Sequence, residues 1–165
     1  MSDNFESAFA HVVGIEGRYS NHPADNGGET MYGITIAVAR AAGYTAPMKD
    51  MPLIVAQQIY RTRYWDAMKC DHLTFKLAEF MFDMAVNSGV GAAAKALQKA
   101  IGVLPDGEIG PKTLAALRNK DPDDIVRLAF VTRAKIFAHH PDRDAFENGW
   151  FARLFDVTAR YFGRA

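Results

Sequence analysis

The segment from Gly14 to Thr35 reads GIEGRYSNHPADNGGETMYGIT, and it is polar and rich in glycine where its flanks are apolar. Its five glycines permit sharp turns and a close approach of another group to the main chain. Pro23 and the Asn26-Gly27-Gly28 cluster exclude a sustained helix. We therefore expect a loop from Tyr19 to Thr35, able to include a short β-hairpin, around which the rest of the chain is organised.

Two carboxylates nine positions apart, Glu16 and Asp25, lie in this segment and are followed by Thr30. A pair of acids suits glycosidic-bond hydrolysis, in which one acid protonates the leaving oxygen and the other handles water or charge. Oxygen ligands at Asp25, Asn26 and Glu29 raise the alternative of a calcium site. The alternation of acids typical of an EF-hand is absent, so we expect no metal here.

Glu16 continues the apolar face of an expected N-terminal helix, on which Phe5, Phe9 and Val12 recur at helical spacing. A carboxyl group on such a face, near a helix C-terminus, is partly desolvated and meets the negative end of the helix dipole. Both effects favour its protonated form. The pattern indicates a proton donor, although a solvated residue in a terminal turn would have the same spacing.

Several of these residues resemble the N-acetylmuramidases of glycoside hydrolase family 108, which occur in phage endolysins and bacterial cell-wall hydrolases. The matching positions are Glu16-Gly17-Arg18-Tyr19, Pro23, Asp25, Gly27-Gly28, Thr30 and Gly33-Ile34-Thr35. The family signature opens Glu-Gly-Gly-Tyr, and Arg18 replaces its second glycine. The resemblance implies that Glu16 is the general acid and that Asp25 positions water or stabilises the oxocarbenium ion, with Thr30 helping to hold the water. Glu29 and Asp83 remain alternatives for the second carboxylate.

The resemblance also indicates candidate substrate-binding residues, one at the start of the loop and the others beyond it. These are Tyr19, Tyr64, Trp65, Asp83, Asn87 and Ser88. Tyr64 and Trp65 belong to an aromatic cluster that could stack on sugar rings, with packing in the core as the alternative. Asp83 and Asn87, one helical turn apart, could reach the cleft or support the structure through hydrogen bonds.

The remaining chain predicts helices. Residues 74–87 are apolar on nearly all sides, which indicates a helix buried at the centre of a domain. Capping residues and helix breakers predict further helices. Thr35 would cap a helix over 36–42, and a linker at Val90-Gly91 would precede a helix over 92–101. The other predicted helices run from Pro52 to Trp65, over 121–137, and from the region of Trp150 to Phe162. The string LQKAIGVLPDGEIGPKTLAAL resembles small helical peptidoglycan-binding modules.

We therefore expect a mainly α fold in two parts. Residues 1–89 would form a lysozyme-like catalytic domain with a glycine-rich active-site loop. Residues 90–165 would form a helical, peptidoglycan-binding-like subdomain packed on it. The family resemblance implies hydrolysis of the β-1,4 bond between N-acetylmuramic acid and N-acetylglucosamine in bacterial peptidoglycan. A lytic transglycosylase is the alternative enzyme, and a non-catalytic cell-wall-binding or phage-tail module is the alternative from another class.

Composition limits the partners and the setting. The 165 residues are 49% hydrophobic, enough for one sizeable core, and 19 basic residues balance 19 acidic ones, which gives no argument for nucleic acid or anionic membranes. Cys70 is a single cysteine, which fits a reducing cytoplasm. No signal peptide or membrane-spanning run is visible. We expect a monomer made in the host cytoplasm that reaches the cell wall after release through a holin.

No cofactor is expected. His139-His140 with Asp142 could suggest zinc, but adjacent histidines point to different sides of a helix.

Overall fold

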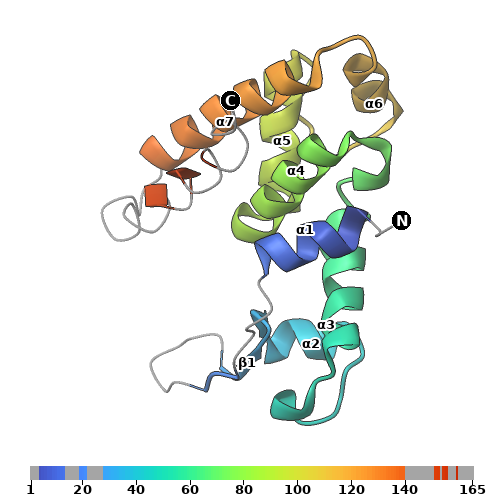
Figure 1. The fold of residues 1–165 in the computed structure, drawn as a ribbon, viewed down its shortest axis with the longest axis vertical. Helices are drawn as coiled ribbons and strands as arrows, with labels where there is room; N and C mark the ends of the chain where they lie inside the picture. The colour runs from blue at the N-terminus through green and yellow to red at the C-terminus, as the bar shows by residue number, and fades with distance from the viewer. Residues whose placement is uncertain are drawn as a thin grey trace. The chain divides into compact units, whose positions relative to one another are not determined.

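The structure is a computed structural model, and it describes residues 4–13, 19–21 and 28–139, with 151–152, 154–155 and 159. Within these residues it is mainly helical, with one two-stranded antiparallel sheet (Figure 1). The chain forms two compact units, Met1–Ala67 and Met68–Ala165. The predicted mainly α fold with a short hairpin is confirmed.

The first unit combines helices with the hairpin. Its elements are α1 (Asn4–Val12), β1 (Thr30–Met31), β2 (Ile34–Thr35), α2 (Ile36–Ala41), η1 (Met48–Asp50), α3 (Leu53–Tyr60) and η2 (Arg61–Trp65). Helix α1 buries Phe5, Ala8, Phe9 and Val12, the face that the sequence predicted. Thr35 begins α2 as predicted, because its Oγ1 accepts a hydrogen bond from the main-chain N–H of Val38 at 3.4 Å.

The hairpin is joined by a two-residue turn. Thr30 lies opposite Thr35 and Met31 opposite Ile34, so Tyr32 and Gly33 make the turn. Both have positive φ, 52° and 75°, as in a type I′ turn. This turn suits the right-handed twist of paired strands and fixes the register of β1, which carries Thr30.

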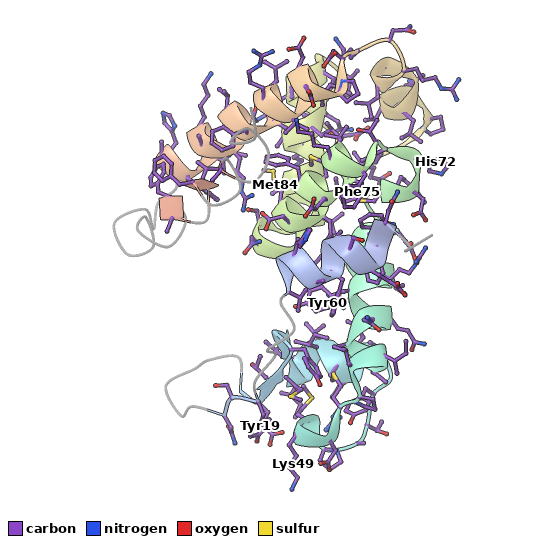
Figure 2. The ribbon with its side chains drawn as sticks, in the orientation of Figure 1. Tyr19, Lys49, Tyr60, His72, Phe75 and Met84 are labelled. Atoms are coloured by element: carbon purple, nitrogen blue, oxygen red, sulfur yellow. The ribbon has the colours of Figure 1, made fainter. Side chains whose placement is uncertain are left out.

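Tyr60 on α3 holds this turn in place. Its hydroxyl donates a hydrogen bond to the Tyr32 carbonyl at 3.0 Å, and its ring packs edge-on against Phe9 with centroids 5.4 Å apart. A Cβ atom on Gly33 would lie 2.8 Å from the Tyr60 hydroxyl oxygen. Position 33 therefore needs glycine both for its φ and for the approach of Tyr60, which links the hairpin to α1 and α3 (Figure 2).

Helix α3 does not continue to Trp65 as the regular helix that was predicted. It passes into the π-helical turn η2, in which the Asp66 N–H donates to the Arg61 carbonyl at 2.8 Å. A π turn contains more residues than an α turn and so changes the face on which the following side chains lie. Trp65 is fully buried and packs edge-on against Phe5, 5.6 Å between centroids, whereas Tyr64 stays half-buried.

The second unit is built on a buried helix. Its elements are η3 (Cys70–His72), α4 (Phe75–Ser88), α5 (Val90–Ile101), α6 (Pro111–Leu117) and α7 (Pro122–Ala138). Every residue from Leu77 to Ala85 on α4 is buried, and α4 packs against α5 and α7 (Figure 1). The predicted central helix is confirmed. The last predicted helix falls largely outside the described residues.

The predicted linker at Val90-Gly91 is wrong. Helix α5 begins at Val90, and only Gly89 separates it from α4. Gly89 has φ 84° and ψ 149°, a conformation open to glycine, so a single residue turns the chain between the two helices.

The chain bends at Gly107, and Gln98 on α5 anchors the bend and the preceding Asp106. The Gln98 side-chain amide donates to the Asp106 carboxylate at 2.6 Å, and its carbonyl accepts from the Gly107 N–H at 2.9 Å. The Glu108 N–H also donates to the Asp106 carboxylate. These donors, with Glu108 the strongest, hold the pKa of Asp106 below its ordinary value.

The close approach of Tyr60 predicts that Gly33→Ala is more damaging than Gly43→Ala. Both glycines have positive φ, but a Cβ on Gly43 would meet nothing within 4 Å. We expect Gly43→Ala to lower the free energy of unfolding by about 1–2 kcal/mol. Gly33→Ala should cost at least about 1 kcal/mol more, because the added methyl group disrupts the Tyr60 hydrogen bond.

Urea denaturation of the two variants measures this difference. The excess cost at position 33 should shrink in a Tyr60→Phe background, where no hydroxyl meets the new methyl group. Equal losses in the two glycine variants would contradict the proposed role of Tyr60.

Candidate active site

The two predicted catalytic carboxylates, Glu16 and Asp25, lie outside the described residues. Residues that the structure describes flank both of them in the sequence. Glu16 lies four residues after Val12, the last residue of α1, and four before Ser20. Asp25 lies midway between Ser20 and Thr30. Ser20 and Thr30 are therefore described residues that flank Asp25, and Ser20 also follows Glu16.

Ser20 and Thr30 pair as an isolated antiparallel bridge. The Ser20 N–H donates to the Thr30 carbonyl at 2.9 Å, and the Thr30 N–H donates to the Ser20 carbonyl at 2.8 Å. The bridge brings the two ends of segment 21–29 together and extends the pairing of β1 beyond the hairpin. Thr30 is thus fixed on both sides, by β2 and by Ser20.

The Thr30 side chain has unused hydrogen-bonding capacity at this position. Its hydroxyl donates to the Gly28 carbonyl at a long distance of 3.4 Å, and the residue is half-buried. A hydroxyl also carries two acceptor lone pairs. Glu29, the neighbouring residue, is half-buried as well, and its carbonyl accepts a hydrogen bond from the Ile36 N–H at 2.8 Å. Main-chain hydrogen bonds therefore hold both Thr30 and Glu29 in place.

The predicted aromatic contacts differ in their exposure. Tyr19, next to the bridge, has 41% of its surface exposed (Figure 2). Tyr64 is half-buried, with its ring 5.5 Å from that of Tyr60. Trp65 has no exposed surface and packs in the core, which was the alternative left open by the sequence. Of the three residues, only Tyr19 and Tyr64 have surface that a ligand could reach.

Asp83 belongs to a buried ion pair in the second unit. Its carboxylate lies 2.6 Å from a terminal guanidinium nitrogen of Arg133 on α7, and both residues are buried. The guanidinium group also lies over the Phe137 ring, 5.3 Å from its centroid. Asn87, which is exposed, donates a hydrogen bond to the Asp83 carbonyl at 2.7 Å, and half-buried Ser88 ends α4. These contacts fit the structural role for Asp83.

Arg133 was missed in the sequence, although a signal for it exists. Ala129, Arg133 and Phe137 follow one another at intervals of four on α7, and all three are buried. An arginine within an apolar stripe at helical spacing requires a buried acid as its partner. The two acidic residues on the apolar helix 74–87, Glu79 and Asp83, were the candidates.

Neither a metal site nor a membrane span occurs in the described part of the chain. No group of three or more histidine, cysteine, aspartate or glutamate side chains there could hold an ion. His139 instead places its Nδ1 atom 2.8 Å from the Lys135 carbonyl, and His140 and Asp142 lie outside the described residues. No helix within the described ranges combines the length and apolarity needed to cross a membrane.

Comparison with known proteins gives two family matches and a structural relative. The glycosyl hydrolase 108 model matches residues 9–89, and a model described as "Predicted Peptidoglycan domain" matches residues 92–155. The solved structure of Brucella abortus SagA is 35% identical, with a TM-score of 0.83 over 98% of this chain and 96% of that chain. The chain belongs to the glycosyl hydrolase 108 family. No curated protein sequence matches it significantly.

Membership of the glycosyl hydrolase 108 family indicates a glycoside hydrolase that acts on peptidoglycan, and the lysozyme-like, mainly α fold is confirmed. The family regions and the compact units divide at different places. The two matched regions meet between residues 89 and 92, whereas the compact units divide between Ala67 and Met68. The predicted division at 89/90 therefore stays a prediction. In the second unit, the ion pair of Asp83 and Arg133 joins the two matched regions.

This ion pair predicts unequal effects of two aspartate substitutions. Asp83→Asn removes a buried charge and leaves Arg133 unpaired, so it should lower the free energy of unfolding by about 3–5 kcal/mol. Asp123→Asn breaks the exposed pair of Lys76 and Asp123, 2.8 Å apart, and should cost at most about 1 kcal/mol. Chemical denaturation of both variants measures these losses. Lost hydrolysis in Asp83→Asn with unchanged stability would contradict the structural role.

Proposed function

We propose that the protein is an N-acetylmuramidase that hydrolyses the β-1,4 bond between N-acetylmuramic acid and N-acetylglucosamine. The observation that carries the proposal is the family match over residues 9–89, a range that contains Glu16, Asp25 and Thr30. A lysozyme-like helical fold with the loop flanked by α1 and the hairpin is consistent with it.

In the proposed mechanism Glu16 is the general acid. It gives its proton to the glycosidic oxygen as the bond to the anomeric carbon breaks, and the sugar becomes oxocarbenium-like. Asp25 stabilises this positive charge or orients the water that attacks the anomeric carbon. The proton of that water passes to a carboxylate, so charge is balanced at the end of the reaction. The protein's own residues complete this chemistry without a cofactor.

Thr30 helps to hold the attacking water in this proposal. Its main chain is fixed by the Ser20 bridge and by β2, and its hydroxyl makes one long hydrogen bond to Gly28. A hydroxyl held in this way can accept from a water molecule without a change of rotamer. Tyr19 and Tyr64 would contact the sugar rings, because both residues are partly exposed.

Glu29 is the stronger alternative to Asp25 for the second carboxylate. It is half-buried and adjacent to Thr30. Asp83 is a weaker alternative, because it is only 4% exposed and its charge is already paired with Arg133. A carboxylate in such a pair has little freedom to orient water.

The setting that we propose is lysis from inside a bacterial host. The chain would be made in the cytoplasm, cross the inner membrane after holin release and act on the wall as a monomeric endolysin. A lytic transglycosylase shares the need for one acid, but it uses a hydroxyl of the substrate in place of water. A non-catalytic wall-binding or phage-tail module would bind peptidoglycan without cleaving it.

Glu16→Gln tests the catalytic acid. It keeps the size of the side chain but cannot donate the proton, so turbidity loss of permeabilised Gram-negative cells should fall at least about 100-fold. The melting temperature should stay within a few degrees, since the charge removed lies outside the buried ion pair. Glu108→Gln, which changes an exposed glutamate, is the matched control and should keep full activity. Lysis by Glu16→Gln above about a tenth of the wild-type rate would reject the assignment.

The same assay on Asp25→Asn and Glu29→Gln separates the two candidates for the second carboxylate. Asp25→Asn should lose at least about tenfold in rate and Glu29→Gln much less. The reverse order would move the role to Glu29.

A further inference from the structure

A pocket of about 270 Å³ in the second unit has an apolar floor and a cationic rim. The turn before α4, the start of α4, the end of α6 and the start of α7 form its walls. Leu77, Leu114 and Ile125 contribute to the floor, and Arg118 and Lys120 lie at the rim. In Figure 1, α6 lies beside the turn that leads into α4.

The two rim cations are available to an anionic ligand. Arg118 and Lys120 are exposed, and within the described residues neither side chain forms an ion pair or a hydrogen bond. The nearby Asp123 carboxylate is already paired with Lys76 at 2.8 Å. His72, also exposed at the rim, adds ring nitrogens (Figure 2).

The other acids at the start of α7 are also engaged. The Asp121 carboxylate caps α7 by accepting from the N–H groups of Asp123 and Asp124, at 2.8 and 3.2 Å. Asp124 forms an ion pair with Arg127. Among the described residues, the charged side chains that remain without a partner at the pocket, Arg118 and Lys120, are therefore both positive.

The start of α4 adds to this positive character. Thr74 lines the pocket and precedes the helix, but its side chain makes no capping hydrogen bond. The first N–H groups of an α-helix have no partner within the helix, and they carry the positive end of its dipole. The start of α7, by contrast, is capped by Asp121.

We propose that this pocket binds the peptide stem of peptidoglycan through a free carboxylate of the stem. The inference rests on the proposed function, since it takes the same polymer as ligand. Stem peptides combine small apolar side chains with free carboxylates, which matches an apolar floor below Arg118 and Lys120. Ligand pockets for drug-sized molecules span about 300–1,000 Å³, so this volume suits one or two stem residues.

The chemistry of the lining favours the peptide over the glycan strand. The described lining contains no phenylalanine, tyrosine or tryptophan, the side chains with the large rings on which sugars stack, and its one aromatic ring is the small imidazole of His72. The walls also come from both matched family regions, because Leu77 lies within 9–89 and Arg118 within 92–155. Binding of a stem here would hold the wall polymer through the second unit while its glycan is cleaved elsewhere.

Titration of the full chain with the tripeptide L-Ala-γ-D-Glu-meso-diaminopimelate tests the proposal, by calorimetry or by NMR shifts. The peptide has no glycosidic bond, so binding is measured apart from catalysis. Arg118→Gln with Lys120→Gln should weaken binding at least about tenfold, because both carboxylate partners are lost. The control Lys99→Gln with Lys135→Gln removes the same charge from exposed positions outside the pocket and should change affinity less than about twofold.

Several results would overturn the proposal. The first is that the peptide does not bind at millimolar concentration, and the second is that both double variants lose peptide affinity equally. The third is that inorganic phosphate or a neutral chitooligosaccharide binds at the pocket as tightly as the peptide. Failure of peptide binding in a protein that cleaves peptidoglycan would reject the pocket and leave the proposed function intact. Peptide binding without cleavage would reject the proposed hydrolase activity and retain the pocket.

Discussion

The hydrogen bond from the Tyr60 hydroxyl to the Tyr32 carbonyl holds the first unit together around its hairpin. It requires glycine at position 33, because a side chain there would occupy the place of the hydroxyl. The type I′ turn fixes the register of β1, and the register places Thr30 opposite both Thr35 and Ser20. The placement of Thr30 and Ser20 thus depends on Tyr60, an aromatic residue 28 positions after Tyr32 in the sequence.

The second unit depends on a different constraint, a charge pair inside an apolar core. Asp83 and Arg133 come from α4 and α7, and each charge is tolerated only because the other lies against it. The pair fixes the rotation of α7 on α4, with Arg133 over Phe137. It also joins the part of the chain matched as glycosyl hydrolase 108 to the part matched as a peptidoglycan domain. Within the second unit, α4 from the first matched region and α7 from the second therefore share one buried ion pair.

The sequence predicted the features that neighbouring residues determine, such as helices and their caps. It missed the features that depend on contacts between residues far apart in the chain. Helix α4 followed from its nearly continuous apolar run, and the start of α2 from the capping residue Thr35. The π turn after Tyr60 was not predictable, because packing rather than propensity selects it. The partner of Asp83 lies 50 residues away, and Gly91, read as a sign of a linker, sits inside α5. Of the site, the sequence indicated Thr30 and its loop, while the burial of Trp65 depended on tertiary packing.

The central claim is hydrolysis on the reducing side of N-acetylmuramic acid, and the masses of the products test it most directly. Purified peptidoglycan is digested with the full chain, the fragments are reduced with borohydride, and their ends are identified by tandem mass spectrometry. The account predicts fragments that end in reduced N-acetylmuramic acid, since water adds to the cleaved bond. Fragments lighter by one water, with an anhydro end that resists reduction, would contradict it, and so would fragments that end in reduced N-acetylglucosamine.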